Sequence, residues 1–185
     1  MDTTAILAIV AVVIVVAVLA FFLYRQNRAK ALRNRFGPEY TNAVRQYGGE
    51  SRAQEALAAR EKRMEKMHIR SLSREDHARF LNEWQTVQRG FVDDPAASIQ
   101  RADALVGQVM SARGYPMADF EHRAEDISVD HPHVVEKYRT AHDIAERHKR
   151  GRAGTEDLRQ AVIYYRDLFD DLLETHPVGE RNHKR

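Results

Sequence analysis

The sequence predicts an all-α membrane protein, in which one N-terminal transmembrane helix precedes a helical bundle of four long helices plus short connecting helices. Three observations lead to this prediction. Residues Ala5 to Tyr24 form a run of twenty residues without a charge or a side-chain amide. Most of the chain after Ser73 repeats apolar residues every three or four positions, as amphipathic helices do. No segment alternates with the period of two that is typical of strands.

The apolar run has the length of a membrane span. Twenty residues of α-helix extend about 30 Å, which matches the thickness of the hydrocarbon layer. The many valines and isoleucines do not favour a strand, because a lone strand leaves its backbone groups unsatisfied in lipid. A cleaved signal peptide has a positive N-terminal region and a shorter apolar core, whereas only the acidic Asp2 precedes this run. We therefore expect a permanent anchor.

A basic segment directly after the run predicts the orientation. Within eleven residues the chain places five cations and no acid, namely Arg25, Arg28, Lys30, Arg33 and Arg35. The positive-inside rule then predicts a single-pass protein of the cell inner (plasma) membrane, with the N-terminus outside and the C-terminal domain in the cytoplasm. We expect the five side chains to contact anionic headgroups, and we favour general contact over recognition of one particular lipid.

Two shorter helices are expected between the membrane and the bundle. Gly37 and Pro38 end the first helix, because glycine terminates helices and proline disfavours a helical conformation in the preceding residue. We expect helices over Pro38–Tyr47 and Glu50–His68. The second has an apolar stripe that Arg60 interrupts, so we interpret it as a stalk or an outer helix, in preference to a coiled coil. The stripe consists of Ala53, Leu57, Met64 and Met67.

Capping residues divide the rest of the chain into four long helices and one short helix. Ser73 is a typical N-cap and Pro95 and Pro132 suit first turns, while Thr155 followed by two acids starts the last helix. A short amphipathic helix is expected over 117–127. The side chains expected in the core are Phe80, Leu81, Trp84, Val87, Phe91, Ile99, Ala102, Val106, Val109, Met110, Phe120, Ala124, Ile127, Val134, Val135, Tyr138, Ala141, Ile144, Leu158, Ala161, Val162, Tyr165, Leu168, Phe169 and Leu172.

These elements define four predicted regions. Residues 1–36 are the transmembrane helix with its basic segment, 37–70 a helical linker or stalk, 71–175 the bundle domain and 176–185 a disordered basic tail. Residues 25–70 carry 12 Lys and Arg against 5 Asp and Glu, and residues 71–175 carry 14 against 20. The positive charge therefore lies beside the membrane, which favours lipid headgroups over nucleic acid as its partner.

The residues offer little for chemistry. The absence of cysteine excludes disulfides, thiol catalysis and thiolate zinc sites. His131, His133, His142 and Glu146 are the densest group of metal-ligating types, but the first two lie more than two helical turns before the others. No glycine-rich phosphate loop or serine-nucleophile motif is present. We therefore expect no catalytic, cofactor-binding or metal residue, and the balance is against an enzyme.

Five short segments resemble an uncharacterised family of bacterial single-span membrane proteins with a C-terminal cytoplasmic helical domain. They are RFGPEY (Arg35–Tyr40), FVDDP (Phe91–Pro95), RGYP (Arg113–Pro116), SVDHP (Ser128–Pro132) and TEDLRQA (Thr155–Ala161). The resemblance covers most of the chain after the apolar run. It implies a bacterial origin and this architecture, and it supplies no catalytic residues. Four of the five segments also coincide with expected helix boundaries, where glycine, proline, aspartate and threonine cap helices.

The functional hypotheses follow from this architecture. The first is a membrane-anchored cytoplasmic module that acts in protein interaction or as a scaffold without catalysis, with a cytoplasmic or membrane protein as partner. The alternative is an enzyme or small-molecule sensor with a pocket inside the bundle. A third is a lipid-responsive regulator acting through the basic segment. An exposed apolar groove favours the first, and an enclosed pocket with convergent polar groups favours the second. The sequence leaves the oligomeric state open.

Overall fold

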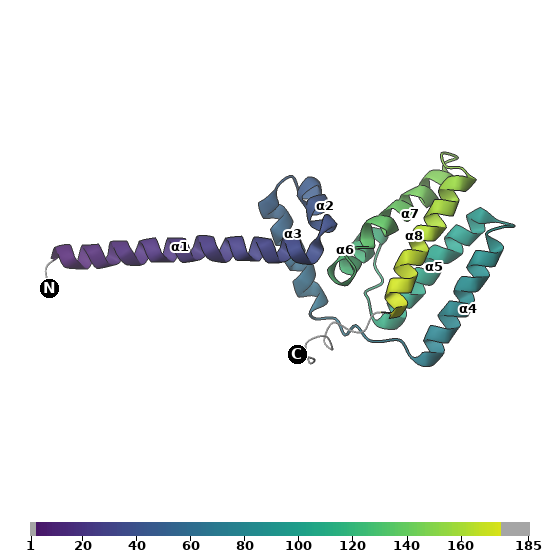
Figure 1. Cartoon of the computed structure of the whole chain (residues 1–185), viewed down its shortest axis with the longest axis horizontal. Coiled ribbons are helices and arrows are strands. Elements are labelled where there is room, and N and C mark those ends of the chain that lie inside the picture. The colour runs from purple at the N-terminus through teal and green to yellow at the C-terminus, as the bar shows by residue number, and fades with distance from the viewer. Residues whose placement is uncertain (1–2, 175–185) are drawn as a thin grey trace. The chain divides into compact units, whose positions relative to one another are not determined.

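A computed structural model describes the backbone of residues 3–174 and the side chains of residues 12–174. Within residues 3–174 the protein has eight α-helices and no strand, which confirms the predicted all-α class (Figure 1). The predicted basic tail, 176–185, lies outside the described residues. The chain divides into two compact units, Met1–Leu57 and Ala58–Arg185, each of which is described by itself. The four predicted domain ranges stay a prediction.

The first unit contains α1 (Thr3–Phe36), α2 (Pro38–Tyr47) and the first half of α3 (Glu50–Met64). α1 runs without a break from the apolar residues through the basic segment. Gly37 ends it with a φ of 49°, a conformation that a side chain with a Cβ rarely adopts, and Pro38 then occupies the first turn of α2 as predicted. α3 ends at Met64, four residues before the predicted His68.

The second unit contains the end of α3 and five further helices. These are α4 (Arg74–Gly90), α5 (Pro95–Arg113), α6 (Phe120–Asp130), α7 (Val135–Lys149) and α8 (Thr155–Glu174). α4 packs on α5, α5 on α8 and α8 on α7, while the shorter α6 packs on α7 (Figure 1). The short connections after α4 and after α7 make α4–α5 and α7–α8 antiparallel helical hairpins. The predicted bundle of four long helices with short connecting helices is confirmed.

Side chains cap the bundle helices largely where the sequence predicts. The backbone N–H of Asp76 donates to Ser73 Oγ (3.0 Å), and that of Ala97 donates to Asp94 Oδ1 (2.9 Å). The last helix differs slightly, because Thr155 is its first residue and Gly154 takes the cap position. The Gly154 N–H donates to Asp157 Oδ2 (2.9 Å), which is half of a capping box.

Two boundaries in the middle of the bundle differ from prediction. α6 begins at Phe120 instead of residue 117, because Asp119 is its N-cap and accepts from the His122 N–H (3.0 Å). α7 begins at Val135 instead of Pro132, because residues 132–134 form a turn. Both helices start three residues later than predicted, at sites where a proline or an acidic cap stands close to an alternative start, and sequence signals seldom separate such starts.

The predicted apolar stripes form most of the bundle core, and Leu105, Tyr115 and Val129 are buried residues that the stripes did not include. The expected residues of α5, α7 and α8 are all buried except Val162, which is half-buried. Trp84 of α4 stacks on Phe169 of α8, with ring centroids 4.8 Å apart. Leu81, expected in the core, is 40% exposed, and Phe91 and Phe120 are half-buried. Leu81 and Phe91 lie at the edges of the stripe on α4, where the burial of an amphipathic face falls off.

Gly114 ends α5 in a position that admits no other residue without movement. Its φ is 92°, and a Cβ added there would lie 2.8 Å from the backbone oxygen of His68. The close approach arises because the extended segment after α3 is fastened to the end of α5. The backbone N–H of Arg70 donates to the Arg113 oxygen, and its Nε donates to the Ala112 oxygen, both at 2.9 Å.

Candidate functional site

The apolar part of α1 exposes every large side chain that the structure describes. Between Val12 and Tyr24 the exposed fractions of these side chains range from 47% to 64%. The helix is long and apolar enough to span a membrane. Contiguous apolar surface of this size is rare on proteins that live in water, and it marks contact with lipid or with another protein.

The basic segment continues α1 beyond the apolar residues. All five of its predicted side chains, those of Arg25, Arg28, Lys30, Arg33 and Arg35, are exposed. At 3.6 residues per turn these positions point to different sides of the helix, so the cations encircle it instead of forming one stripe. Such a ring suits a flat anionic layer that surrounds the helix, and it does not suit a single ligand held on one side.

Two arginines of the basic segment also hold the start of α3. Arg25 Nη2 donates to Ser51 Oγ at 2.9 Å, and Arg33 Nη2 pairs with Glu50 Oε1 at 3.1 Å. The Arg33 guanidinium also lies over the Tyr40 ring, 5.1 Å from its centroid. These contacts lie within the first unit and fix the turn between α2 and α3 beside the basic segment. Sequence reasoning did not anticipate them.

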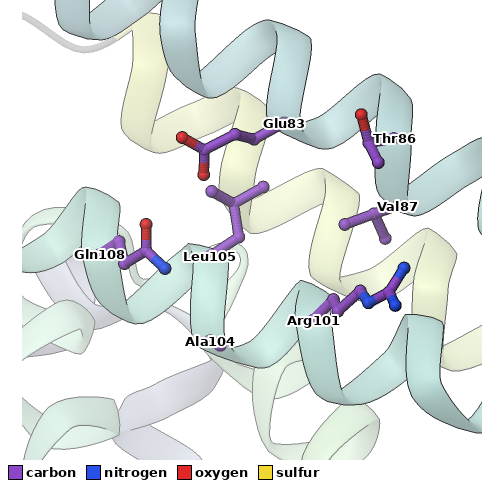
Figure 2. A pocket seen from close by; sticks show the side chains of 7 residues that line it. All are labelled: Glu83, Thr86, Val87, Arg101, Ala104, Leu105 and Gln108. Atoms are coloured by element: carbon purple, nitrogen blue, oxygen red, sulfur yellow. The ribbon is translucent and has the colours of Figure 1, made fainter.

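The bundle has a groove between α4 and α5 with an apolar floor (Figure 2). Its volume is about 320 Å³, and Val87, Ala104 and Leu105 form the apolar part. Figure 2 shows Glu83 and Gln108 towards one end and Arg101 at the other. Glu83 is paired with Arg79 (3.0 Å), whereas Arg101 forms no ion pair with a described residue.

Arg60 is buried, whereas the sequence pattern indicates a charge that breaks the apolar stripe of α3. Its side chain is 2% exposed, and its guanidinium donates to Ser128 Oγ (3.3 Å) and pairs with Glu125 Oε1 (3.1 Å) on α6. One turn later, Arg63 pairs with Asp126 (2.6 Å) and with Glu125 (3.3 Å). Burial lowers the pKa of Arg63, but the hydrogen bonds and charges of Asp126 and Glu125 outweigh it and raise the pKa. This network fastens the end of α3 to α6.

The signal for Arg60 was present in the sequence. It stands three residues after Leu57 and four before Met64, which is the spacing of the buried stripe itself. A cation at such a position is buried when an acid lies opposite, because arginine retains its charge in the interior. The acid that accepts it, Glu125, lies more than 60 residues away, so sequence order alone could not pair the two.

A second buried network joins the end of α6 to α8. His131, 1% exposed, contacts Asp171 through Nδ1 and Tyr115 OH through Nε2 (3.2 Å). Tyr115 OH donates to Asp130 Oδ2 (3.0 Å), and His133 Nε2 lies 3.3 Å from Asp171. Burial raises the pKa of Asp171, but the His131 hydrogen bond and the His131 and His133 charges outweigh it, so the pKa is lowered. Burial also raises the pKa of Tyr115, which stays a protonated donor.

Two further tyrosines lie at the centre of the bundle. The hydroxyls of Tyr138 and Tyr165 are buried without a hydrogen-bond partner among the described residues, and Asp103 Oδ1 and Arg123 Nε are in the same situation. Burial, and then the Asp103 carboxylate, raises the pKa of both phenols. Neither tyrosine therefore supplies a phenolate near neutral pH. Sequence reasoning assigned Tyr165 to the core, where the structure places it.

The four side chains considered as metal ligands do not form one group among the described residues. His142 stacks on Phe120, with ring centroids 3.6 Å apart, and Glu146 pairs with Lys149 at 2.6 Å. Within the part of the chain that the structure describes, no group of three or more metal-ligating side chains forms. His131 and His133 both contact Asp171, but only His131 is buried, and the His133 side chain is exposed.

The chain was compared with models of known protein families, with curated proteins and with solved structures, and none of them matches it. The family resemblance carried by the five short segments therefore stays a prediction. The candidate site rests on the geometry of this chain alone.

Proposed function

We propose that this chain is a single-pass membrane-anchored module whose helical bundle, in the cytoplasm, binds a protein partner and catalyses no reaction. The observation that carries the proposal is the exposed apolar surface of α1, from Val12 to Tyr24, which continues as one helix into the basic segment. Lipid is the solvent that stabilises the first part of this helix, and anionic headgroups stabilise the second.

The orientation of the proposed anchor rests on the basic segment. Five exposed cations follow the apolar part of α1, and positively charged flanks remain on the cytoplasmic side of inner membranes. The chain contains no cysteine, so a single introduced cysteine is a unique label. Thr140 is exposed on α7, so the thiol of the Thr140→Cys variant should react with a membrane-impermeant maleimide only after the membrane is opened. Labelling in intact spheroplasts would contradict the proposed orientation.

The α4–α5 groove supports the interaction part of the proposal. Its apolar floor suits one or two apolar side chains of a partner helix, and the exposed cation Arg101 suits an acidic residue beside them. Arg101 forms no ion pair with any described residue. The groove is open to solvent instead of enclosed, which favours a protein segment over a small substrate.

Site-specific photocrosslinking tests this docking surface in the native membrane. A photoreactive amino acid replaces Ala104, which is exposed in the groove, and a control replaces Ile163, which is 39% exposed on α8. We expect one discrete protein adduct from position 104 and none from position 163. Ala104→Glu should lower the amount of partner recovered with the full-length chain by about tenfold, a change of about 1.4 kcal/mol.

The matched variant Ile163→Glu should leave partner recovery unchanged. Equal adducts from both positions would indicate nonspecific capture, and adducts from neither position would remove the groove as the docking surface. Recovery of the chain by itself from its own membranes would count against the interaction function as a whole.

A further inference from the structure

We infer that the turn between α2 and α3, residues 45–52, is a second membrane-contacting element that binds anionic phospholipid headgroups beside the basic segment. This inference rests on the proposed membrane anchor. It adds to that anchor a surface that lies twenty residues further along the chain and that the sequence did not indicate.

The unbroken α1 helix sets the depth of this turn. Arg25 follows the last residue of the apolar run, so in the proposed anchor it stands where hydrocarbon gives way to headgroups. Arg25 donates to Ser51 Oγ at 2.9 Å, which brings the first turn of α3 within reach of one arginine side chain. The headgroup layer on each face of a bilayer is about 5–7 Å thick.

A second contact, between Glu50 and Arg33, places the turn at the same depth in the membrane. Glu50, the neighbour of Ser51, pairs with Arg33 at 3.1 Å. Arg25 and Arg33 are eight residues apart, or about 12 Å along the helix axis. The start of α3 is held between them, which places it about 6 Å beyond Arg25. This level falls within the headgroup layer.

The chemistry of the turn suits anionic lipid. Arg45 and Arg52 are both exposed, while Glu50, the one acid of the segment, is paired with Arg33. Arg45 donates to Asn42 (2.7 Å) and Arg52 to the Tyr47 backbone oxygen (3.4 Å). Each guanidinium has five N–H groups, so most of its donors stay available to phosphate oxygens.

The surroundings of the turn leave this face open. A Cβ added at Gly49 would meet no atom within 4 Å, and Gly48 is exposed. Tyr47, half-buried beside the two glycines, is an aromatic residue of the kind enriched at membrane interfaces. A second contact to one side of α1 would also limit rotation of the helix about its own axis, which a symmetrical ring of cations cannot do.

Fluorescence quenching in vesicles tests the depth of the turn. Single cysteines replace Gln46, which is exposed at the turn, Thr41, which is exposed near the other end of α2, and Val15 inside the apolar part of α1. Each full-length variant carries a fluorophore and is reconstituted into phosphatidylcholine vesicles with or without phosphatidylglycerol. Lipids bearing a nitroxide on the headgroup or on the acyl chain serve as quenchers.

We expect the headgroup nitroxide to quench the label at position 46 at least about twofold more than the label at position 41, and phosphatidylglycerol to increase this difference. Arg45→Glu with Arg52→Glu should abolish the difference, because it reverses the charge that attracts the lipid. The matched pair Arg150→Glu with Arg152→Glu, exposed in the turn after α7, should leave it unchanged.

The label at position 15 separates the two proposals. If the acyl-chain nitroxide quenches position 15 while positions 46 and 41 respond equally, the anchor stands and the membrane-contacting turn is refuted. If position 15 is not quenched, the anchor fails and the inference fails with it. A difference between 46 and 41 that survives the double charge reversal would refute the role of Arg45 and Arg52.

Discussion

The apolar part of α1 and the bundle use the same residue types in opposite ways. Phe22 of α1 is 63% exposed, whereas Phe80 and Phe169 of the bundle are 1% and 0% exposed. The difference follows from the arrangement of polar residues. Each bundle helix has a polar face, so its apolar stripe is buried against its neighbours in water, while the apolar part of α1 has no polar face. Periodicity, more than hydrophobic content, therefore decides which solvent a helix requires.

The charged residues of the two units show a parallel contrast. In the first unit, Arg33 pairs with Glu50, and their own side chains are 62% and 63% exposed. In the second unit, Arg60 pairs with Glu125 at exposed fractions of 2% and 19%, and Asp126, 2% exposed, pairs with Arg63. Exposed pairs contribute little to stability, whereas a buried pair is costly to break because one charge is left without a partner. An ion pair should therefore contribute differently to the free energy of unfolding in the two units.

The largest expected effect is on the anchor. Val15→Arg with Leu19→Arg should disfavour membrane insertion by roughly 6 kcal/mol, because each cation near the bilayer centre costs about 3 kcal/mol. The chain should then be released from membranes by alkaline carbonate extraction. Leu81→Arg with Ile163→Arg places the same charges on exposed apolar residues of the bundle and should leave the chain in the membrane pellet. Retention of the α1 variant would contradict the anchor.

The same truncation in both regions sharpens the contrast in packing. Phe169→Ala should lower the free energy of unfolding of the bundle by about 4 kcal/mol, because it leaves a cavity in a closely packed core. Phe22→Ala should change it by less than about 0.5 kcal/mol, as is usual for exposed positions. Thermal unfolding followed by circular dichroism in detergent measures both. Equal losses would show that α1 is packed against protein.

An arginine substitution in each unit compares the ion pairs. Arg60→Met should cost about 2 kcal/mol of stability, since Ser128 and Glu125 lose a buried charged donor while the apolar volume is largely kept. Arg33→Met, at the exposed pair, should cost about 0–1 kcal/mol. Urea unfolding gives both values. A cost at Arg33 that matches the cost at Arg60 would mean that Arg33 is less accessible to water than the structure indicates.

Among the substitutions in the bundle, the smallest expected effect depends on pH. The lowered pKa of Asp171 means that its ionised form stabilises the fold. This stability is present above the unfolded-state pKa of about 3.9 and is lost as the pH falls through the lower folded-state value. Asp171→Asn should therefore lower the free energy of unfolding by about 1–2 kcal/mol at pH 7, and the deficit should shrink below about pH 4. A deficit that does not change with pH would show that Asp171 acts through packing.

Much of the fold was predictable because its determinants are local. Pro38, Ser73 and Pro95 mark helix starts by their own conformational preferences, and the stripes of α5, α7 and α8 mark their buried faces. The prediction was wrong where two local signals compete, as at Pro132 and Val135. It was also wrong at the end of α3, where the chain leaves the helix and is fastened to the end of α5.

The polar contacts were not predictable, because each depends on residues far apart in the sequence. Arg60 meets Ser128, His131 meets Asp171, and Arg113, 1% exposed, donates to the Leu172 backbone oxygen at 2.6 Å. Sequence periodicity shows that a position faces inward, but it cannot show which acid or carbonyl lies opposite. For the same reason the basic segment was identified from sequence, whereas its contacts with Glu50 and Ser51 were not.

The stacked pair of Trp84 and Phe169 has a practical consequence. Trp84 is the one tryptophan of the chain and is 2% exposed in the bundle core. Tryptophan emission of the full-length protein therefore comes from the bundle alone, with no contribution from α1 or from its surroundings. A shift of that emission to longer wavelength would report opening of the bundle in the proposed membrane-anchored state, without an added label.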